Sequence, residues 1–305
     1  MRVAVVTTAD GDAVHDDLDR PILEEACARA GIELVHHAWE DDAVAWDAFD
    51  LVVVRSPWNY VDAEARFRTF LQRTRSSTRF HNPVPLIEWN IDKHYLVDLA
   101  ERGVPVVPTA YVERTIDIGD ALASVGTSEI VVKPTVSAGS RLTGRFVEGD
   151  PAAAALAAAI IDDGRAAMVQ PYLPSVDVEG EHAVIVIDGE VAHRSRKAQI
   201  LETGGTFLGG VYREIITPAE PDAVLDGVAS LAADACRSIA RERGWIGPSD
   251  ELLYARYDVA RTADGAVLLE AELFEPALFL PSGPSTADRL ADAIAARVHR
   301  RAAGR

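Results

Sequence analysis

Residues 252–259 have the sequence LLYARYDV, and residues 267–274 have the sequence VLLEAELF. Asp264-Gly265 stands between them, and an Asp-Gly pair flanked by apolar segments is a strong signal for a tight turn. The two segments therefore predict a β-hairpin. The many Leu and Phe residues of the second arm indicate that the hairpin is buried on part of both faces.

Three carboxylates lie in this hairpin. Glu270 and Glu272 are two residues apart, so they point to one face of their strand, roughly 7 Å apart. Asp258 lies on the other arm. A solvated hairpin face is the alternative, but buried like charges persist only where cations compensate them. Oxygen ligands of this kind suit magnesium shared with phosphate, as one or two ions, and manganese could take its place.

A second segment, residues 133–140 with the sequence KPTVSAGS, follows an apolar strand. Its Lys and its small-residue loop can present an ammonium group, backbone N–H groups and hydroxyls to a phosphate. An ordinary turn is the alternative. The candidate phosphate-binding residues are Lys133, Ser137, Gly139 and Ser140.

Lysine is rare in this chain. The chain has 30 Lys and Arg residues in total, and only Lys93, Lys133 and Lys197 are Lys. Since Arg serves wherever a generic positive charge suffices, each remaining Lys is a candidate for a site that needs a compact ammonium group.

The bulk composition excludes some classes of function. The 305 residues carry a formal net charge of −18, which disfavours nucleic acid and anionic membranes as partners. No apolar run is long enough to span a bilayer, and Cys27 and Cys236 form no metal-binding pattern. We expect both cysteines to be buried and the protein to be cytoplasmic.

The length predicts two or three packed units. Alternating strands and helices predict a small parallel α/β domain over residues 1–85, which ends at an Asn-Pro-Val-Pro segment. No GxGxxG follows its first strand, so a dinucleotide site has little support. The rest has an α+β pattern, which we divide into residues 86–167 and 168–305. It includes a helix expected at 90–102, a hairpin at 183–193, and helices at 223–243 and 286–300.

The order of these motifs resembles that of the ATP-grasp superfamily of carboxylate ligases, over about residues 80–285. The resemblance implies an ATP-grasp fold, with ATP between two α+β subdomains that follow the N-terminal α/β domain. It implies ATP and magnesium as cofactors, and a small-molecule carboxylate that is activated as an acyl phosphate for attack by an amine.

The resemblance also assigns roles to residues. Nucleotide binding falls to Lys93, Lys133, Ser137, Gly139, Ser140, Gln170, Tyr172, Leu173 and Glu181. Metal ligation falls to Asp258, Glu270 and Glu272, although many relatives have Asn at the last of these positions. Arg256, Arg213 and Lys197 are the candidate catalytic residues, because a guanidinium or ammonium group can brace the transferring phosphate or the substrate carboxylate.

Substrate specificity is expected in segments that the superfamily does not share. The candidates are Arg55, Ser56, Asn59 and Tyr60 after the third strand, and Gly209 and Gly210 in a glycine-rich loop. These segments resemble those of small-metabolite ligases such as the O-ureido-serine cyclo-ligases of cycloserine biosynthesis, which would convert O-ureido-D-serine to D-cycloserine.

Three alternatives remain open. They are an amino-acid or peptide ligase of the glutathione-synthase or ribosomal-modification type, a kinase that uses the same ATP site, and an ATP-binding module without catalysis. A homodimer is the default expectation for the oligomeric state.

Overall fold

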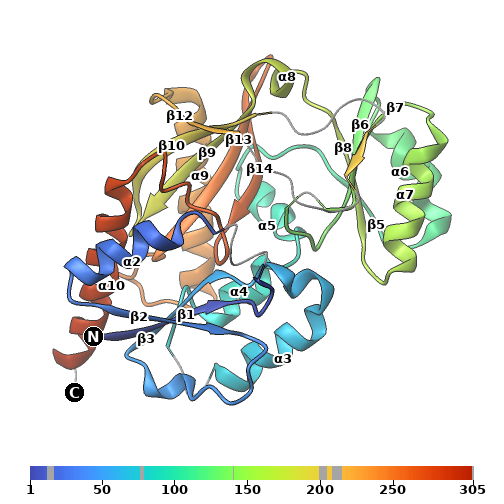
Figure 1. Cartoon of the computed structure of the whole chain (residues 1–305). Coiled ribbons are helices and arrows are strands. Elements are labelled where there is room, and N and C mark those ends of the chain that lie inside the picture. Colours follow the sequence, from blue (N-terminus) through green and yellow to red (C-terminus); the bar gives the residue numbers. More distant parts are fainter. Residues whose placement is uncertain (12–16, 76–78, 140, 199–204, 208–214, 304–305) are drawn as a thin grey trace.

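The computed structural model describes residues 1–11, 17–75, 79–139, 141–198, 205–207 and 215–303. Four predicted site residues, Ser140, Gly209, Gly210 and Arg213, lie outside this part of the chain. The described residues form three sheets: an N-terminal sheet, a sheet called central for its place in the sequence, and a third sheet towards the C-terminus. In Figure 1 the central sheet lies at the right-hand end of the molecule, and the third sheet lies above the N-terminal one.

The N-terminal sheet is parallel and has the order β2-β1-β3-β4. Its strands are β1 (Arg2–Thr7), β2 (Glu33–Ala38), β3 (Leu51–Ser56) and β4 (Phe80–His81), and its helices are α2 (Arg20–Arg29) and α3 (Glu64–Thr74). The Val-rich strands β1 and β3 are almost wholly buried, as expected for a parallel sheet covered on both faces. The predicted parallel α/β unit is therefore present.

The helix predicted at residues 90–102 is wrong as a single helix. The structure has α4 (Val84–Asn90) and α5 (Tyr95–Glu101), which are separated by a turn at residues 91–94. In this turn the His94 amide donates to Asp92 Oδ1 at 2.9 Å, and the Lys93 amide donates to Thr135 O at 2.9 Å. Such bonds compete with the helical ones, so the chain leaves the helix and turns Lys93 towards the central sheet.

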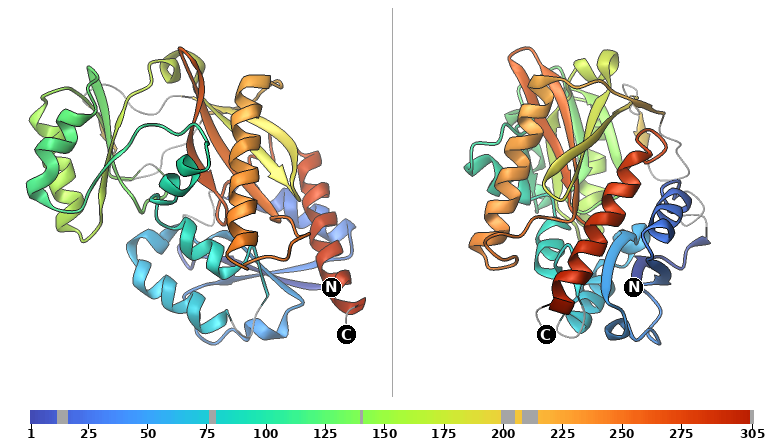
Figure 2. Two further views of the ribbon diagram at one scale, coloured as in Figure 1. Left: turned by 180° about the vertical axis from the view of Figure 1, so that it is seen from behind. Right: turned by 90° about the vertical axis from the view of Figure 1, so that its left-hand side faces the viewer.

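The central sheet is antiparallel with the order β11-β7-β6-β8-β5. Its strands are β5 (Ala110–Val112), β6 (Glu129–Pro134), β7 (Thr143–Val147), β8 (Ala167–Pro171) and β11 (Thr206–Phe207). Helices α6 (Ile118–Ser124) and α7 (Pro151–Asp162) pack on its outer face (Figure 2). Because β8 pairs with both β5 and β6, the division predicted at 167–168 separates β8 from the sheet it joins.

The third sheet is antiparallel with the order β12-β10-β9-β13-β14, and it contains both predicted hairpins. Its strands are β9 (Glu181–Ile187), β10 (Glu190–Lys197), β12 (Ile216–Pro218), β13 (Tyr254–Thr262) and β14 (Gly265–Glu272). Alternate residues of β9 and β13 face opposite cores. One face packs against α9 (Ala223–Glu242) and α5, and the other against α10 (Ser285–Ala303) and α2.

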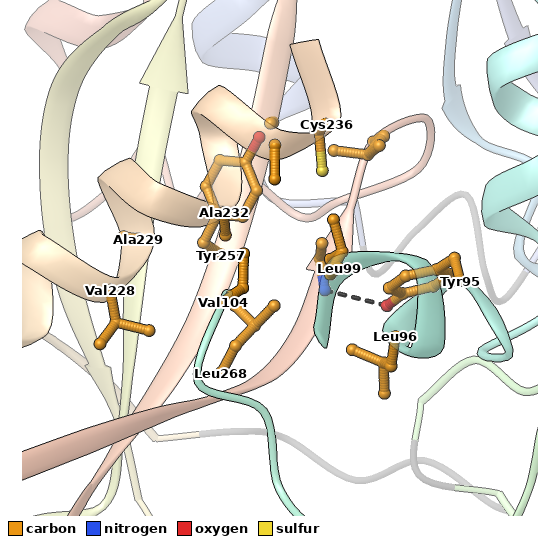
Figure 3. Close-up of a cluster of buried hydrophobic side chains, with 14 of the residues drawn as sticks. Tyr95, Leu96, Leu99, Val104, Val228, Ala229, Ala232, Cys236, Tyr257 and Leu268 are labelled. Carbon is orange, nitrogen blue, oxygen red and sulfur yellow. Dashed lines mark hydrogen bonds between the residues drawn. The ribbon is translucent and has the colours of Figure 1, made fainter. Parts of the chain in front are cut away.

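Figure 3 shows the core between α9 and the hairpin. Tyr257 of β13 packs there with Cys236 of α9, and Tyr95 of α5 accepts a hydrogen bond from the Ala271 amide at 2.9 Å. Cys236 and Cys27 are both buried and free, as expected. Within the described chain, no helix combines the length and the apolar character needed to cross a membrane.

Two asparagines fix the helical segment around α4 to the hairpin. Asn82 Nδ2 donates to the carbonyls of Tyr254 and Leu273 at 2.8 and 2.6 Å, and Asn82 Oδ1 accepts from the Leu253 amide at 2.7 Å. Asn90 joins Ala271 and Leu273 in the same way. Because both amides satisfy buried backbone groups, they hold the hairpin in a fixed position against the N-terminal unit.

Candidate active site

The hairpin of β13 and β14 brings the predicted acidic residues together. Asp258 lies opposite Glu270, and Arg256 lies opposite Glu272. Asp258 is 2% exposed, whereas the side chains of Glu270 and Glu272 are each 25% exposed. The two glutamates therefore form the accessible face of the cluster, and Asp258 forms its floor.

Arg256 is buried and forms ion pairs with Asp258 and Glu272. Its Nε donates to Asp258 Oδ1 at 2.8 Å, and its Nη2 donates to Asp258 Oδ2 at 2.9 Å and to Glu272 Oε1. Nη1 donates to Ala277 O at 2.9 Å, and the guanidinium lies 4.8 Å from the centre of the Phe279 ring. A bidentate, buried arginine of this kind fixes the geometry of the carboxylates it joins.

All three lysines of the chain meet at the same cluster. Lys197 Nζ donates to Asp258 Oδ2 and to Glu181 Oε2, both at 2.9 Å. Lys133 Nζ donates to Glu270 Oε1 at 2.9 Å, and Lys93 Nζ lies 4.0 Å from the same oxygen. The lysines come from β6, β10 and the turn after α4, so only the tertiary fold brings them together.

These cations shift the titration of the acids. Burial would raise the pKa of Glu270, but the ammonium groups of Lys133 and Lys93 outweigh it and hold the pKa well below its usual range. Arg256 and Lys197 likewise outweigh burial and lower the pKa of Asp258. For Glu272, burial and the charges of Asp258 and Glu270 outweigh Arg256 and raise the pKa to about 7.

The cluster fits a divalent cation only in part. Among the described residues, no group of three or more His, Cys, Asp or Glu side chains is arranged to hold a metal. Both oxygens of Asp258 accept hydrogen bonds from Arg256 or Lys197. Glu270 Oε2 and Glu272 Oε2, in contrast, accept no hydrogen bond in this part of the chain. Two accessible carboxylate oxygens on one strand face suit magnesium.

The predicted phosphate loop lies beside the lysines. Lys93 Nζ donates to Ser137 Oγ at 3.0 Å and to Ser137 O at 3.1 Å. Gly139 is exposed and has a φ of 61°, a conformation that favours glycine. The loop therefore starts at the cluster and makes a turn at Gly139.

The predicted adenine segment follows β8 and uses its side chains within the protein. Gln170 Nε2 donates to Thr109 Oγ1 at 2.8 Å. The Tyr172 hydroxyl donates to Asp177 at 2.6 Å, and the Arg145 guanidinium lies 3.4 Å from the centre of its ring. Leu173 is partly buried and packs against the apolar cluster that contains Tyr172 and Val176. These contacts leave the side chains of Gln170 and Tyr172 engaged, so a role in nucleotide binding would fall to the backbone here.

The predicted substrate residues have unequal surroundings. Arg55 is buried, donates to Asp19 at 3.2 Å and lies 5.2 Å from the centre of the Tyr254 ring. Ser56 is buried, and its hydroxyl has no hydrogen-bond partner among the described residues. Asn59 accepts from the Trp39 indole at 2.8 Å and also contacts Glu40. Asn59 is thus held within the N-terminal unit, whereas Arg55 lies between that unit and β13.

Tyr60 differs from these neighbours because it reaches the loop that follows β14. Its hydroxyl donates to Glu275 Oε1 at 2.8 Å, and the indole of Trp58 donates to Glu275 O at 3.0 Å. Sequence analysis did not single out Glu275 as a site residue. Its place directly after the acidic strand was the available signal, but its burial depends on residues about 215 positions away.

The fold and this cluster define the class of protein. The chain has the fold of an ATP-grasp protein from Sphaerobacter thermophilus that contains a RimK domain, with a TM-score of 0.63 over 96% of this chain and 99% of that one, at 18% identity. In this chain, the N-terminal α/β unit is followed by two antiparallel sheets with helices packed on them, the arrangement predicted from the sequence motifs.

The family follows from closer relatives. Residues 3–82 match the model of the N-terminal domain of the D-cycloserine synthetase DcsG. The cycloserine biosynthesis protein DcsG of Streptomyces lavendulae is 36% identical over 309 residues, which cover 97% of this chain and 98% of the relative. The crystal structure of D-cycloserine synthetase DcsG superimposes with a TM-score of 0.88 at 34% identity, and covers 98% of this chain and 100% of that one. The chain belongs to the DcsG family of ATP-grasp ligases.

Proposed function

We propose that this protein closes the ring of D-cycloserine from O-ureido-D-serine at the expense of ATP. The observation that carries the proposal is the convergence of Lys93, Lys133, Lys197 and Arg256 on the carboxylates of one hairpin. A site with this many cations and acids, in a chain with a net charge of −18, suits an anionic ligand together with a metal ion.

The lysines are suited to hold the phosphates of ATP. Lys133 and Lys93 share Glu270, so each ammonium group can turn from that carboxylate to a phosphate oxygen with little movement. Residues 137–140 would cover the phosphates, residues 170–173 would hold the adenine and Glu181 would bind the ribose. Glu270 and Glu272 would hold magnesium, with Asp258 below them, and the bound ion would neutralise the charge of the phosphate oxygens.

The chemistry proceeds in two steps. A substrate carboxylate oxygen attacks the γ-phosphorus of ATP, ADP leaves, and an acyl phosphate forms. The nitrogen that is bonded to the side-chain oxygen of the substrate then attacks the acyl carbon, and phosphate leaves as that nitrogen loses its proton. Since cycloserine lacks the carbamoyl group of O-ureido-D-serine, this group must also be removed. One water molecule hydrolyses it: the bond between the ring nitrogen and the carbamoyl carbon breaks, the ring nitrogen regains a proton, and the group leaves as carbon dioxide and ammonia.

The residues of this chain would contribute mainly positioning and charge stabilisation. Arg256 is held in place by Asp258, Glu272 and the Ala277 carbonyl, so its guanidinium is oriented before any ligand binds. Lys197 donates to Asp258 Oδ2, the same oxygen that accepts from Arg256 Nη2. Together they would stabilise the negative charge that develops during phosphoryl transfer. We also propose Arg213 as a brace, from its place in the sequence.

The test is ADP release that depends on magnesium, measured with O-ureido-D-serine, D-alanine, glutamate and dipeptides as substrates. We expect release with O-ureido-D-serine, together with D-cycloserine detected by mass spectrometry. Glu272→Gln should reduce the rate about 100- to 1000-fold. Glu148→Gln, an exposed carboxylate change in the turn after β7, is the matched control and should leave the rate unchanged.

Other outcomes would redirect the proposal. Release of ADP with D-alanine or a dipeptide alone would make the protein an amino-acid or peptide ligase. ATP binding without turnover of any carboxylate would favour a binding module. A stable phosphorylated product that hydroxylamine does not trap would identify a kinase.

A further inference from the structure

Glu275 differs from the other acids around the site because it has no ion pair with a described residue. The described ion pairs give every other one a cation: Arg256 and Lys197 pair with Asp258, Lys133 with Glu270, and Arg256 with Glu272. Glu275 is 8% exposed and forms no ion pair with a described residue. Its hydrogen bond at Oε1 comes from Tyr60, a neutral donor.

The surroundings of Glu275 fix its position. The Tyr60 hydroxyl holds Oε1 at 2.8 Å, and the Trp58 indole holds the backbone carbonyl at 3.0 Å. Tyr60 in turn packs against Phe67 and Phe274 in the core below. Oε2 accepts no hydrogen bond from a described residue. It is also not one of the fully buried polar atoms that lack a partner. One carboxylate oxygen is therefore fixed, and the other keeps some access to solvent.

A carboxylate in this position needs a positive partner. Burying an ionised carboxylate without a cation costs several kcal/mol. Burial and the neighbouring charge of Glu272 raise the pKa of Glu275 to about 8, although Lys93 and Arg256 are close enough to lower it. The protein thus supplies the carboxylate, its orientation and a low-dielectric setting, but leaves out the cation.

We propose that Glu275 binds the protonated amino group of the substrate, so that the enzyme selects an amino acid over a simple carboxylic acid. The inference rests on the proposed function. In an amino acid the ammonium group lies two bonds from the carboxylate carbon. A carboxylate activated beside Arg256 and the lysines would therefore carry its ammonium group to the adjoining loop, where Glu275 supplies a charged hydrogen-bond acceptor.

The experiment compares two substrates that differ only by the amino group: O-ureido-D-serine and its deamino analogue, 3-(ureidooxy)propanoate. In the wild-type protein we expect kcat/KM for ADP release to be about 10- to 100-fold lower for the analogue, the range expected for a charged hydrogen bond. Glu275→Gln keeps the shape and the acceptor for Tyr60, but removes the charge. It should lower kcat/KM for O-ureido-D-serine alone, so that the two substrates become nearly equal, with KM for ATP unchanged.

Two further variants separate binding from structure. Glu148→Gln should preserve the preference for the amino compound. Tyr60→Phe retains the charge of Glu275 but not its orientation, so it should reduce the preference only several-fold. This variant also tests the inference if Glu275→Gln does not fold, because a purely structural role would change both substrates equally.

An undiminished preference in Glu275→Gln would overturn the inference, as would a wild-type protein that uses both substrates equally. Failure of the proposed function gives a different result, in which the wild-type protein releases no ADP with either compound. Calorimetric binding of the two compounds to the wild-type and variant proteins then decides the inference. Equal affinity of the wild type for both, or no binding of either, would overturn it.

Discussion

Two buried acids of this protein, one on the hairpin and one on the loop that follows it, have different partners. Asp258, on the hairpin, accepts hydrogen bonds from Arg256 and Lys197, and these cations lower its pKa. Glu275, on the loop after the hairpin, accepts from the phenol of Tyr60, and burial raises its pKa to about 8. The first acid contributes to the stability of the fold, whereas the second costs stability at neutral pH and is retained for binding.

The largest expected effect is on the paired acid. Asp258→Asn removes the charge that compensates both Arg256 and Lys197, and breaking a buried ion pair costs about 3–5 kcal/mol. Urea unfolding at pH 7 should show a loss of about 3 kcal/mol in the free energy of unfolding. A loss below about 1 kcal/mol would mean that water or another acid compensates the two cations.

Glu275→Gln should instead increase the free energy of unfolding. Between pH 4.5 and about 8 the folded protein holds a proton on Glu275 that the unfolded chain releases, so this group makes stability fall as pH rises. We expect wild type and variant to be equal near pH 4.5, and the variant to be more stable by about 1–3 kcal/mol at pH 8. The prediction is wrong if the difference in the free energy of unfolding between wild type and variant is independent of pH, or if the variant is the less stable protein at pH 8.

The smallest effect concerns an exposed ion pair. Arg141, near the phosphate loop, donates to Asp62 Oδ2 of the N-terminal unit at 2.6 Å, with side chains 40% and 51% exposed. Because water and salt screen such pairs, Arg141→Ala should reduce the free energy of unfolding by less than about 1 kcal/mol. Thermal unfolding at low and high salt measures this. If Arg141→Ala lowered the free energy of unfolding as much as Asp258→Asn, burial would not explain the difference between the exposed and the buried ion pair.

The parts of the fold predicted from sequence are those specified by local patterns. Two apolar segments around the Asp264-Gly265 turn predicted the hairpin, and the register in the structure places Asp258 opposite Glu270. The expected helix at 90–102 failed because Asp92 bonds to the next turn of chain, a local competition that apolar periodicity does not record.

The residue types at the site were predicted from the sequence, but their contacts were not. Rare lysines indicated the residues that gather at the hairpin acids, and the structure brings all three to within 4.0 Å of Glu270 or Asp258. Asp258 is held by cations of the chain, and the more exposed acids are Glu270 and Glu272, so the three-acid metal site stays a prediction. Arg55 contacts Asp19 and the ring of Tyr254, and Asn59 contacts Trp39, so a substrate role for these two residues stays a prediction.

By itself, the sequence determined the secondary structure of the hairpins, the class of fold and the identity of most charged groups at the site, since turn chemistry, strand alternation and residue type act over short distances. Only the tertiary structure decided which acids have a cation. Tyr60 meets Glu275 across 215 residues, and Lys133 meets Glu270 across 137. Burial and pairing depend on groups that packing brings together, and these settle the charge of each acid and hence its role.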